Sequence, residues 1–185
     1  MSYKPLFYLA IVSIVAFSSC NNAVKKKQLA KIDSLITIID TTGNKLNTIN
    51  KDTVTKKYET YKQTNKKVAE HYQKYRNEEN WNYLCNYQNV RKPFKTMVLN
   101  YNSFNADLKS AREQLENLKH DVQEGLISKE EFDNYFILEA KNTNEISFKI
   151  NKQVESVLNQ YKNFDTIQPY MLKLIDSYAE NKKNK

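Results

Sequence analysis

An apolar repeat with alternating spacings of three and four residues constrains this chain more than any other feature. The repeat extends through residues 54–75, 87–122 and 136–164, and a shorter stretch covers residues 29–39. Such spacing places apolar side chains along one face of a helix, and over several heptads it is typical of coiled-coil packing. The chain has only two glycines and three prolines, so long helices are expected and strands are not.

Short connections between the repeats predict how the helices pack. Residues 77–80 (NEEN) leave room only for a tight antiparallel turn. Gly125 stands where a left-handed helix cap is expected, and Ser128 with Glu131 forms a capping box for the next helix. The prediction is an all-α fold: an elongated, antiparallel three-helix bundle of coiled-coil type over residues 28–182.

Three places in the sequence are expected to interrupt these helices. A four-helix bundle is the alternative if Pro93 ends a short helix instead of kinking a long one. The repeat shifts phase at the Thr41-Thr42-Gly43 step, where a kink or break is expected. Pro169 lacks the amide proton that a helix interior needs, so a kink or stop is expected there. The segment beyond it would then fold over the end of the bundle or form a short helix.

The first twenty residues carry a different signal. One lysine precedes an apolar run from Leu6 to Phe17, which is shorter than the roughly 20 residues that span a bilayer. Two serines then lead to Cys20. This arrangement resembles a bacterial lipoprotein signal peptide of the type found in Bacteroidetes. The resemblance covers residues 1–20 only, and Phe17 departs from the leucine that is usual at its position.

The resemblance implies a processed and lipidated N-terminus. Residues 1–19 would be removed, and Cys20 would carry a covalent diacylglycerol and a fatty acyl chain such as palmitate. Residues 20–27 would form a short basic tether, and residues 183–185 a basic tail. The alternatives are an ordinary secretory signal that leaves Cys20 as a free thiol, and an uncleaved membrane anchor.

The residues after Cys20 indicate in which membrane the lipidated protein is expected. Asn21 is not the aspartate that retains related lipoproteins in the inner membrane, and no acidic run follows it. The expected location is the outer membrane of the cell envelope, facing the periplasm, with the cell surface as the alternative. Lys25 to Lys27 follow the anchor closely, so they either contact anionic head groups or form a solvated helix start.

Composition narrows the chemistry. The net charge is +8, but the charges are dispersed and the chain is exported, so lipid head groups and polysaccharides are expected as acidic partners and nucleic acid is not. With Cys20 acylated, Cys85 is the only thiol, which excludes an internal disulfide. His71 and His120 have no second histidine one helical turn away, and no catalytic motif occurs. We therefore expect no metal, no cofactor and no enzymatic activity.

Four Asp-Ser/Thr steps resemble the O-glycosylation motif of exported Bacteroidetes proteins. The resemblance makes five hydroxyl side chains candidates for modification: Ser34, Thr41, Thr42, Thr53 and Thr166. The preference of Asp, Ser and Thr for helix starts is the alternative explanation.

The thirteen tyrosines allow two interpretations. Many of them lie on the apolar stripe, where they either fill the core or line an aromatic groove for a glycan or small molecule. Asn65, on the same stripe, is interpreted as a buried residue that fixes the helix register.

Together these observations predict a non-catalytic spacer, scaffold or adaptor, lipid-anchored and binding another envelope component. A helical module for a glycan or small molecule, using the inward tyrosines, is the alternative. The expected partner surface lies at the end of the bundle away from the membrane and gathers residue types enriched at interfaces: Trp81, Leu84, Tyr170, Met171 and Leu174, with Cys85 nearby. A self-contained hydrophobic cap is the other interpretation. The oligomeric state stays open.

Overall fold

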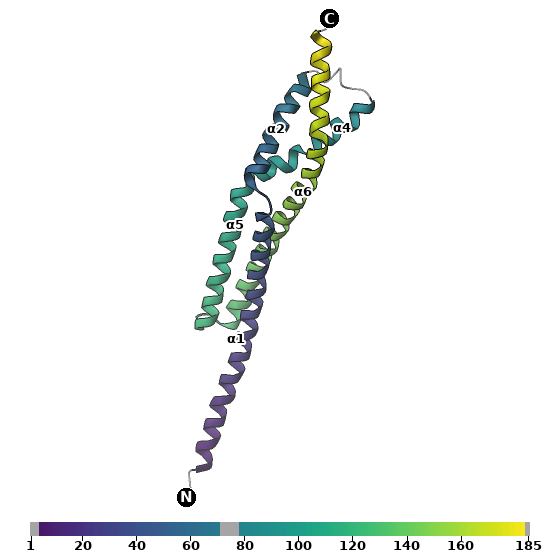
Figure 1. The fold of residues 1–185 in the computed structure, drawn as a ribbon. Helices are drawn as coiled ribbons and strands as arrows, with labels where there is room; N and C mark the ends of the chain where they lie inside the picture. The colour runs from purple at the N-terminus through teal and green to yellow at the C-terminus, as the bar shows by residue number, and fades with distance from the viewer. Residues whose placement is uncertain (1–3, 71–77, 184–185) are drawn as a thin grey trace. The chain divides into compact units, whose positions relative to one another are not determined.

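The computed structural model describes residues 4–70 and 78–183, and the side chains of residues 22–70 and 80–177. Within these ranges the chain is almost entirely helical and contains no strand, so the all-α prediction is confirmed. The helices are α1 (Lys4–Asn47), α2 (Lys51–Glu70), α4 (Glu78–Asn89), α5 (Arg91–Glu124) and α6 (Lys129–Lys183) (Figure 1).

Contacts divide the chain into two compact units. The first unit combines Met1–Thr41 with Asp107–Ile146, and the second combines Thr42–Ala106 with Ser147–Lys185. Helices α1, α5 and α6 each contribute residues to both units.

In the first unit, α1 and α5 each bury an apolar stripe, and α6 adds the buried Phe132. The predicted spacing of three and four is kept by Ile32, Ile36 and Ile39 on α1 and by Leu108, Ala111, Leu115, Leu118 and Val122 on α5, and Leu35 is buried in addition. Full burial of one such side chain stabilises the fold by about 1.5–3 kcal/mol. The stripes therefore account for the pairing of these helices.

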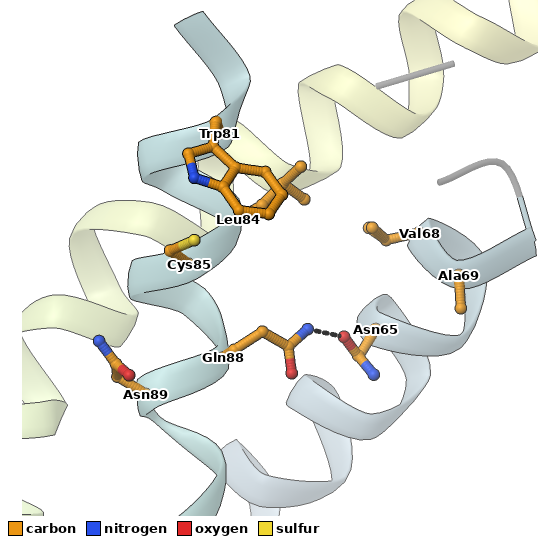
Figure 2. A pocket seen from close by; sticks show the side chains of 8 residues that line it. All are labelled: Asn65, Val68, Ala69, Trp81, Leu84, Cys85, Gln88 and Asn89. Atoms are coloured by element: carbon orange, nitrogen blue, oxygen red, sulfur yellow. Dashed lines mark hydrogen bonds between the residues drawn. The ribbon is translucent and has the colours of Figure 1, made fainter. Parts of the chain in front are cut away.

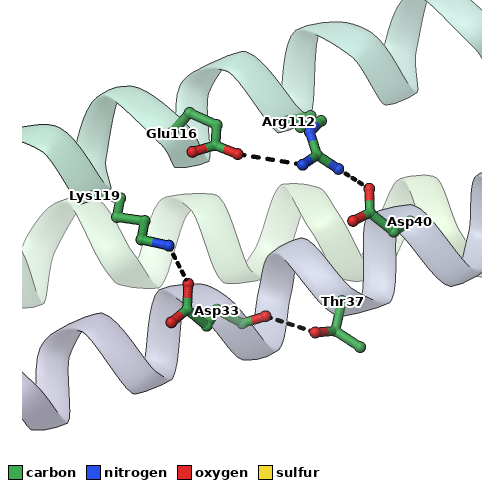
Figure 3. A network of polar contacts seen from close by, with 6 residues as sticks. All are labelled: Asp33, Thr37, Asp40, Arg112, Glu116 and Lys119. Carbon is green, nitrogen blue, oxygen red and sulfur yellow. Dashed lines mark hydrogen bonds and ion pairs between the residues drawn. The ribbon is translucent and has the colours of Figure 1, made fainter.

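Two ion pairs join α1 to α5 in this unit (Figure 3). Lys119 Nζ lies 2.7 Å from Asp33 Oδ1, and Arg112 pairs with Asp40 as well as with Glu116. The two acidic residues on α1 are seven apart, and so are their basic partners on α5, in the opposite order. This heptad match shows that the two helices run antiparallel, and a shift by one turn would separate both cross-helix pairs.

The core of the second unit is aromatic. The rings of Tyr61 and Tyr87 lie 5.1 Å apart, Tyr87 stacks on Phe164 at 6.2 Å, and Phe94 lies 5.8 Å from Phe164. Tyr61 and Tyr87 are buried, so the core interpretation holds for both. Burial in this apolar cluster raises the pKa of the Tyr87 hydroxyl.

A buried hydrogen-bond chain links three helices of the second unit. Tyr87 on α4 donates its hydroxyl proton to Gln168 Oε1 on α6, and Gln168 Nε2 donates to Thr64 Oγ1 on α2 at 2.9 Å. All three side chains are buried. Because an unpaired buried polar group is costly, this chain holds α2, α4 and α6 in one arrangement.

The predicted break at the Thr41-Thr42-Gly43 step is wrong, because α1 continues to Asn47 and the break falls at residues 48–50. Thr42 is buried and its hydroxyl lies 2.8 Å from Ser147 Oγ, a tertiary contact that holds this turn in place. The break itself is local: Asn50 Oδ1 accepts a hydrogen bond from Thr53 N at 2.8 Å and so caps the start of α2.

The helix that contains Pro93 is also interrupted. α4 ends at Asn89, and α5 begins at Arg91 after a turn at Val90. Pro93 thus falls in the first turn of α5, where its missing amide proton costs nothing. Pro93 therefore does not end a helix itself, and the break between the short α4 and the long α5 lies at Val90.

The expected stop at Pro169 is wrong, because α6 runs through it to Lys183. Pro169 and Asp165, whose carbonyl loses its intrahelical donor, are both exposed. Water can therefore satisfy that carbonyl, and the buried neighbours Ile167, Gln168 and Met171 keep the helix in place.

The turn between α5 and α6 matches its prediction. Gly125 has φ +70°, Leu126 N donates to Asp121 O at 2.9 Å, and Gly125 N donates to Val122 O at 3.3 Å. These are the two bonds of a Schellman cap. Ser128 N then donates to Glu131 Oε2 at 2.8 Å and Glu131 N to Ser128 Oγ at 3.2 Å, which confirms the capping box. The Ser128 hydrogen bonds lower the pKa of Glu131.

Candidate functional site

A pocket of about 640 Å³ lies between α2 and α4 in the second unit (Figure 2). Val68 on α2 and Leu84 on α4 are buried and form its apolar walls, with Ala69 beside Val68. Trp81, one turn before Leu84, stands at its edge and remains 42% exposed. The pocket therefore has a partly exposed aromatic side chain at its edge and an apolar interior.

Carboxamides form the other side of this pocket. Tyr61 donates its hydroxyl proton to Gln88 Oε1 at 2.7 Å, and Gln88 Nε2 donates to Asn65 Oδ1. This chain fixes the orientation of both carboxamides and places the Asn65 amide nitrogen at its end (Figure 2). Asn89 completes the polar side. A ligand that enters would meet oriented amide groups as well as apolar walls.

The lining contains no Asp, Glu, Lys, Arg or His among the residues that the structure describes. Cys85 also lines the pocket, and its thiol is exposed. Because a buried charge is costly without a partner of opposite charge, a pocket of this composition favours an uncharged group. It suits an apolar side chain or a ligand with hydroxyl and amide groups.

The predicted partner residues are brought together only in part. Trp81 and Leu84 line the pocket with Cys85. Tyr170 stacks on Tyr83, with ring centroids 3.9 Å apart, and donates its hydroxyl proton to Asn80. Met171 is fully buried and Leu174 is half-buried. Met171 is therefore a core residue, and its assignment to an exposed partner surface is wrong.

Asn65 also differs from its prediction. It is half-buried and lines the pocket, while the buried position on this turn of α2 is taken by Thr64. Sequence reasoning missed the α2 side of the pocket, because the stripe assigned both Asn65 and Val68 to the core. The signal that was available is the polar character of Asn65 and Gln88 within otherwise apolar helix faces.

The candidate modification sites differ in accessibility. Ser34, Thr41, Thr53 and Thr166 are exposed, and their modification stays a prediction. Thr42 is only 2% exposed and is held by Ser147, so a glycan does not fit there and that candidate is wrong.

Some of the predicted features involve residues that the structure does not describe. The Cys20 side chain, His71 and part of the turn at residues 77–80 lie outside the described residues. His120 is exposed on α5. In the described part of the chain, no three His, Cys, Asp or Glu side chains are grouped as a metal site would need. Across the same residues, no helix combines the length and apolar character needed to cross a bilayer.

Comparisons with models of protein families, with curated proteins and with solved structures found no match for this chain.

Proposed function

We propose that this chain is a lipid-anchored protein of the bacterial cell envelope that acts as a non-catalytic scaffold or adaptor. It holds another envelope component in the pocket between α2 and α4. The anchor is a diacylglycerol and an acyl chain on Cys20, in the outer membrane and facing the periplasm. The sequence of residues 1–20 supports the anchor, and the pocket supports the binding role.

The observation that carries the binding role is the partly exposed Trp81 beside a pocket whose described lining is apolar and carboxamide. Burying the exposed 42% of this side chain removes about 100 Å² from water, which is worth about 2.5 kcal/mol or roughly 70-fold in affinity. Apolar and carboxamide side chains make up the described part of the lining, which suits a binding role.

The proposal includes the finer architecture. The helices form a three-helix bundle of coiled-coil type, and this bundle serves as a spacer. The antiparallel pairing of α1 with α5 supports it. The contacts of Thr42 with Ser147 at 2.8 Å and Lys45 with Glu155 at 2.7 Å support a parallel pairing of α1 with α6. The break at Val90 makes a four-helix description the alternative.

The partner is tested by purifying the full chain from a mild detergent extract of membranes and identifying the proteins that accompany it. Trp81→Ala is compared with Tyr135→Ala, which removes a similarly exposed aromatic side chain (48%) from the first unit. We expect one accompanying protein to be lost in Trp81→Ala and kept in Tyr135→Ala, with the melting temperature of both variants unchanged. Loss of melting temperature in Trp81→Ala with the partner retained would make this region a hydrophobic cap.

A glycan or another uncharged small molecule is the second candidate ligand. The volume of the pocket and its oriented carboxamides favour it, whereas Tyr61 and Tyr87 are buried in the core and do not offer their rings to a ligand. Trp81 is the only tryptophan, so its fluorescence reports on the pocket directly. A saturable change on titration with neutral envelope oligosaccharides, absent from the Leu84→Asp variant, would favour the second candidate over a protein partner.

The anchor has its own test. Cys20→Ala should release the protein from the membrane fraction and abolish labelling by a fatty-acid analogue. Membrane retention equal to that of the wild type, with residues 1–19 still attached, would contradict the proposed processing.

A further inference from the structure

We propose that the turn between α5 and α6 is a second membrane contact, in which Leu126 enters the interfacial layer of the bilayer that holds the acyl chains of Cys20. This inference rests on the proposed lipid anchor and adds a site to it. The occupant is a lipid surface.

The fold brings this turn beside the start of the mature chain. A cavity of about 430 Å³ in the first unit is lined by Asn22, Val24 and Gln28 of α1, and by Gly125, Ile127 and Lys129 from the turn. Lys25 Nζ donates a hydrogen bond to Gln123 O at the end of α5 and so joins the two elements. Cys20 precedes Asn22 by two residues, about 3 Å along a helix. A lipid on Cys20 therefore places this turn at the bilayer surface.

Local structure does not explain why residue 126 is apolar. In a Schellman cap the residue at this position commonly packs against an apolar side chain in the last turn of the helix. Here the corresponding positions are Asp121 and His120, which offer no apolar contact. Leu126 is left 65% exposed at the tip of the turn. A lipid surface supplies the apolar environment that the protein does not.

The contact is apolar rather than electrostatic. Four lysines surround this end of the first unit, Lys25, Lys26, Lys27 and Lys129, and four acidic side chains balance them: Asp121, Glu124, Glu130 and Glu131. With no net charge at this end, attraction to anionic head groups is small. Insertion should therefore depend little on the charge of the lipid or on salt, which separates this site from a basic patch.

The test places a tryptophan at the turn of the full-length, lipidated protein. Leu126→Trp is made in a Trp81→Phe background and reconstituted into vesicles that contain lipids brominated on their acyl chains. The matched control is Leu138→Trp in the same background. Leu138 is 63% exposed and belongs to the same unit, but lies nine residues into α6, about 14 Å along the helix.

Emission from residue 126 should shift to shorter wavelength and be quenched by the brominated lipids, equally in neutral and anionic vesicles. Emission from residue 138 should keep its intensity. Equal emission from both positions, whether both are quenched or neither is, would overturn the inference. If either variant loses helical content, a nitroxide on Leu126→Cys or Leu138→Cys, with Cys85→Ser, measures exposure to oxygen and to a water-soluble nickel complex instead.

Mass spectrometry of the same sample separates this inference from the anchor. A sample without acyl mass on Cys20 refutes the anchor, and this inference falls with it. A sample that carries the acyl mass but leaves residue 126 unquenched refutes only the membrane contact of the turn.

Discussion

Replacing Tyr87 by phenylalanine tests whether the buried hydrogen-bond chain positions the two helices that form the pocket. The substitution keeps the aromatic packing against Tyr61 and Phe164 and removes only the hydroxyl group. Gln168 Oε1 then stays buried without its donor. An unsatisfied buried acceptor costs about 1–3 kcal/mol. For a chain of this length, 2 kcal/mol corresponds to a melting temperature lower by about 4–8 °C.

The assay is thermal unfolding followed by circular dichroism, with Trp81 fluorescence recorded in parallel. Tyr135→Phe, at an exposed tyrosine, is the control and should change the free energy of unfolding by less than about 0.5 kcal/mol. Because Thr64 and Tyr87 join α2 and α4 through Gln168, the fluorescence of Trp81 should also change in Tyr87→Phe. A melting temperature equal to that of the control would refute the structural role of this chain.

The same tyrosine predicts how stability depends on pH. Burial raises the pKa of Tyr87, and also that of Tyr61 and Tyr161. The unfolded chain releases these phenolic protons at lower pH than the folded chain does, so it binds fewer protons at high pH. The contribution of these tyrosines to stability should therefore be constant below the ordinary tyrosine pKa of about 10 and fall as the pH rises above it. Tyr87→Phe should make that fall less steep.

Three further substitutions test local features by thermal unfolding. Gly125→Ala should cost about 1 kcal/mol, because the added Cβ meets no atom within 4 Å and only the positive φ opposes it; an unchanged stability would contradict the Schellman cap. Pro169→Ala should raise the melting temperature by restoring the hydrogen bond to the Asp165 carbonyl inside α6; a lower value would mean that the proline suits a bend there. Asp40→Asn should change the melting temperature by less than about 2 °C, since its ion pair with Arg112 is exposed; a large loss would show that register depends on this pair.

The sequence was sufficient to predict features that depend only on residues close together in the chain. Gly125, Ser128 and Glu131 predicted the cap and the capping box, because both features are made by side chains and backbone groups within six residues of one another. The apolar stripes likewise predicted the buried residues of α5. These features follow from helix geometry alone.

Features that depend on distant residues were predicted less well. Thr42 suggested a break, but its hydroxyl contact with Ser147, 105 residues away, holds α1 intact. Pro169 suggested a stop, but its place on the exposed side of α6 makes the lost hydrogen bond tolerable. Trp81 and Leu84 predicted the α4 side of the pocket. The α2 side depends on how α2 pairs with α4, and the sequence pattern of one helix does not show that pairing.

The most direct test of the proposed adaptor function is crosslinking from the pocket in the native envelope. Cys85 lines the pocket, its thiol is exposed, and the proposed acylation of Cys20 would leave no other thiol in the chain. A thiol-reactive photo-crosslinker on Cys85 should capture one envelope protein in intact membranes, and Trp81→Ala should abolish the product while Tyr135→Ala preserves it. Capture of the same proteins by wild type and Trp81→Ala, or of none by either, would contradict the account.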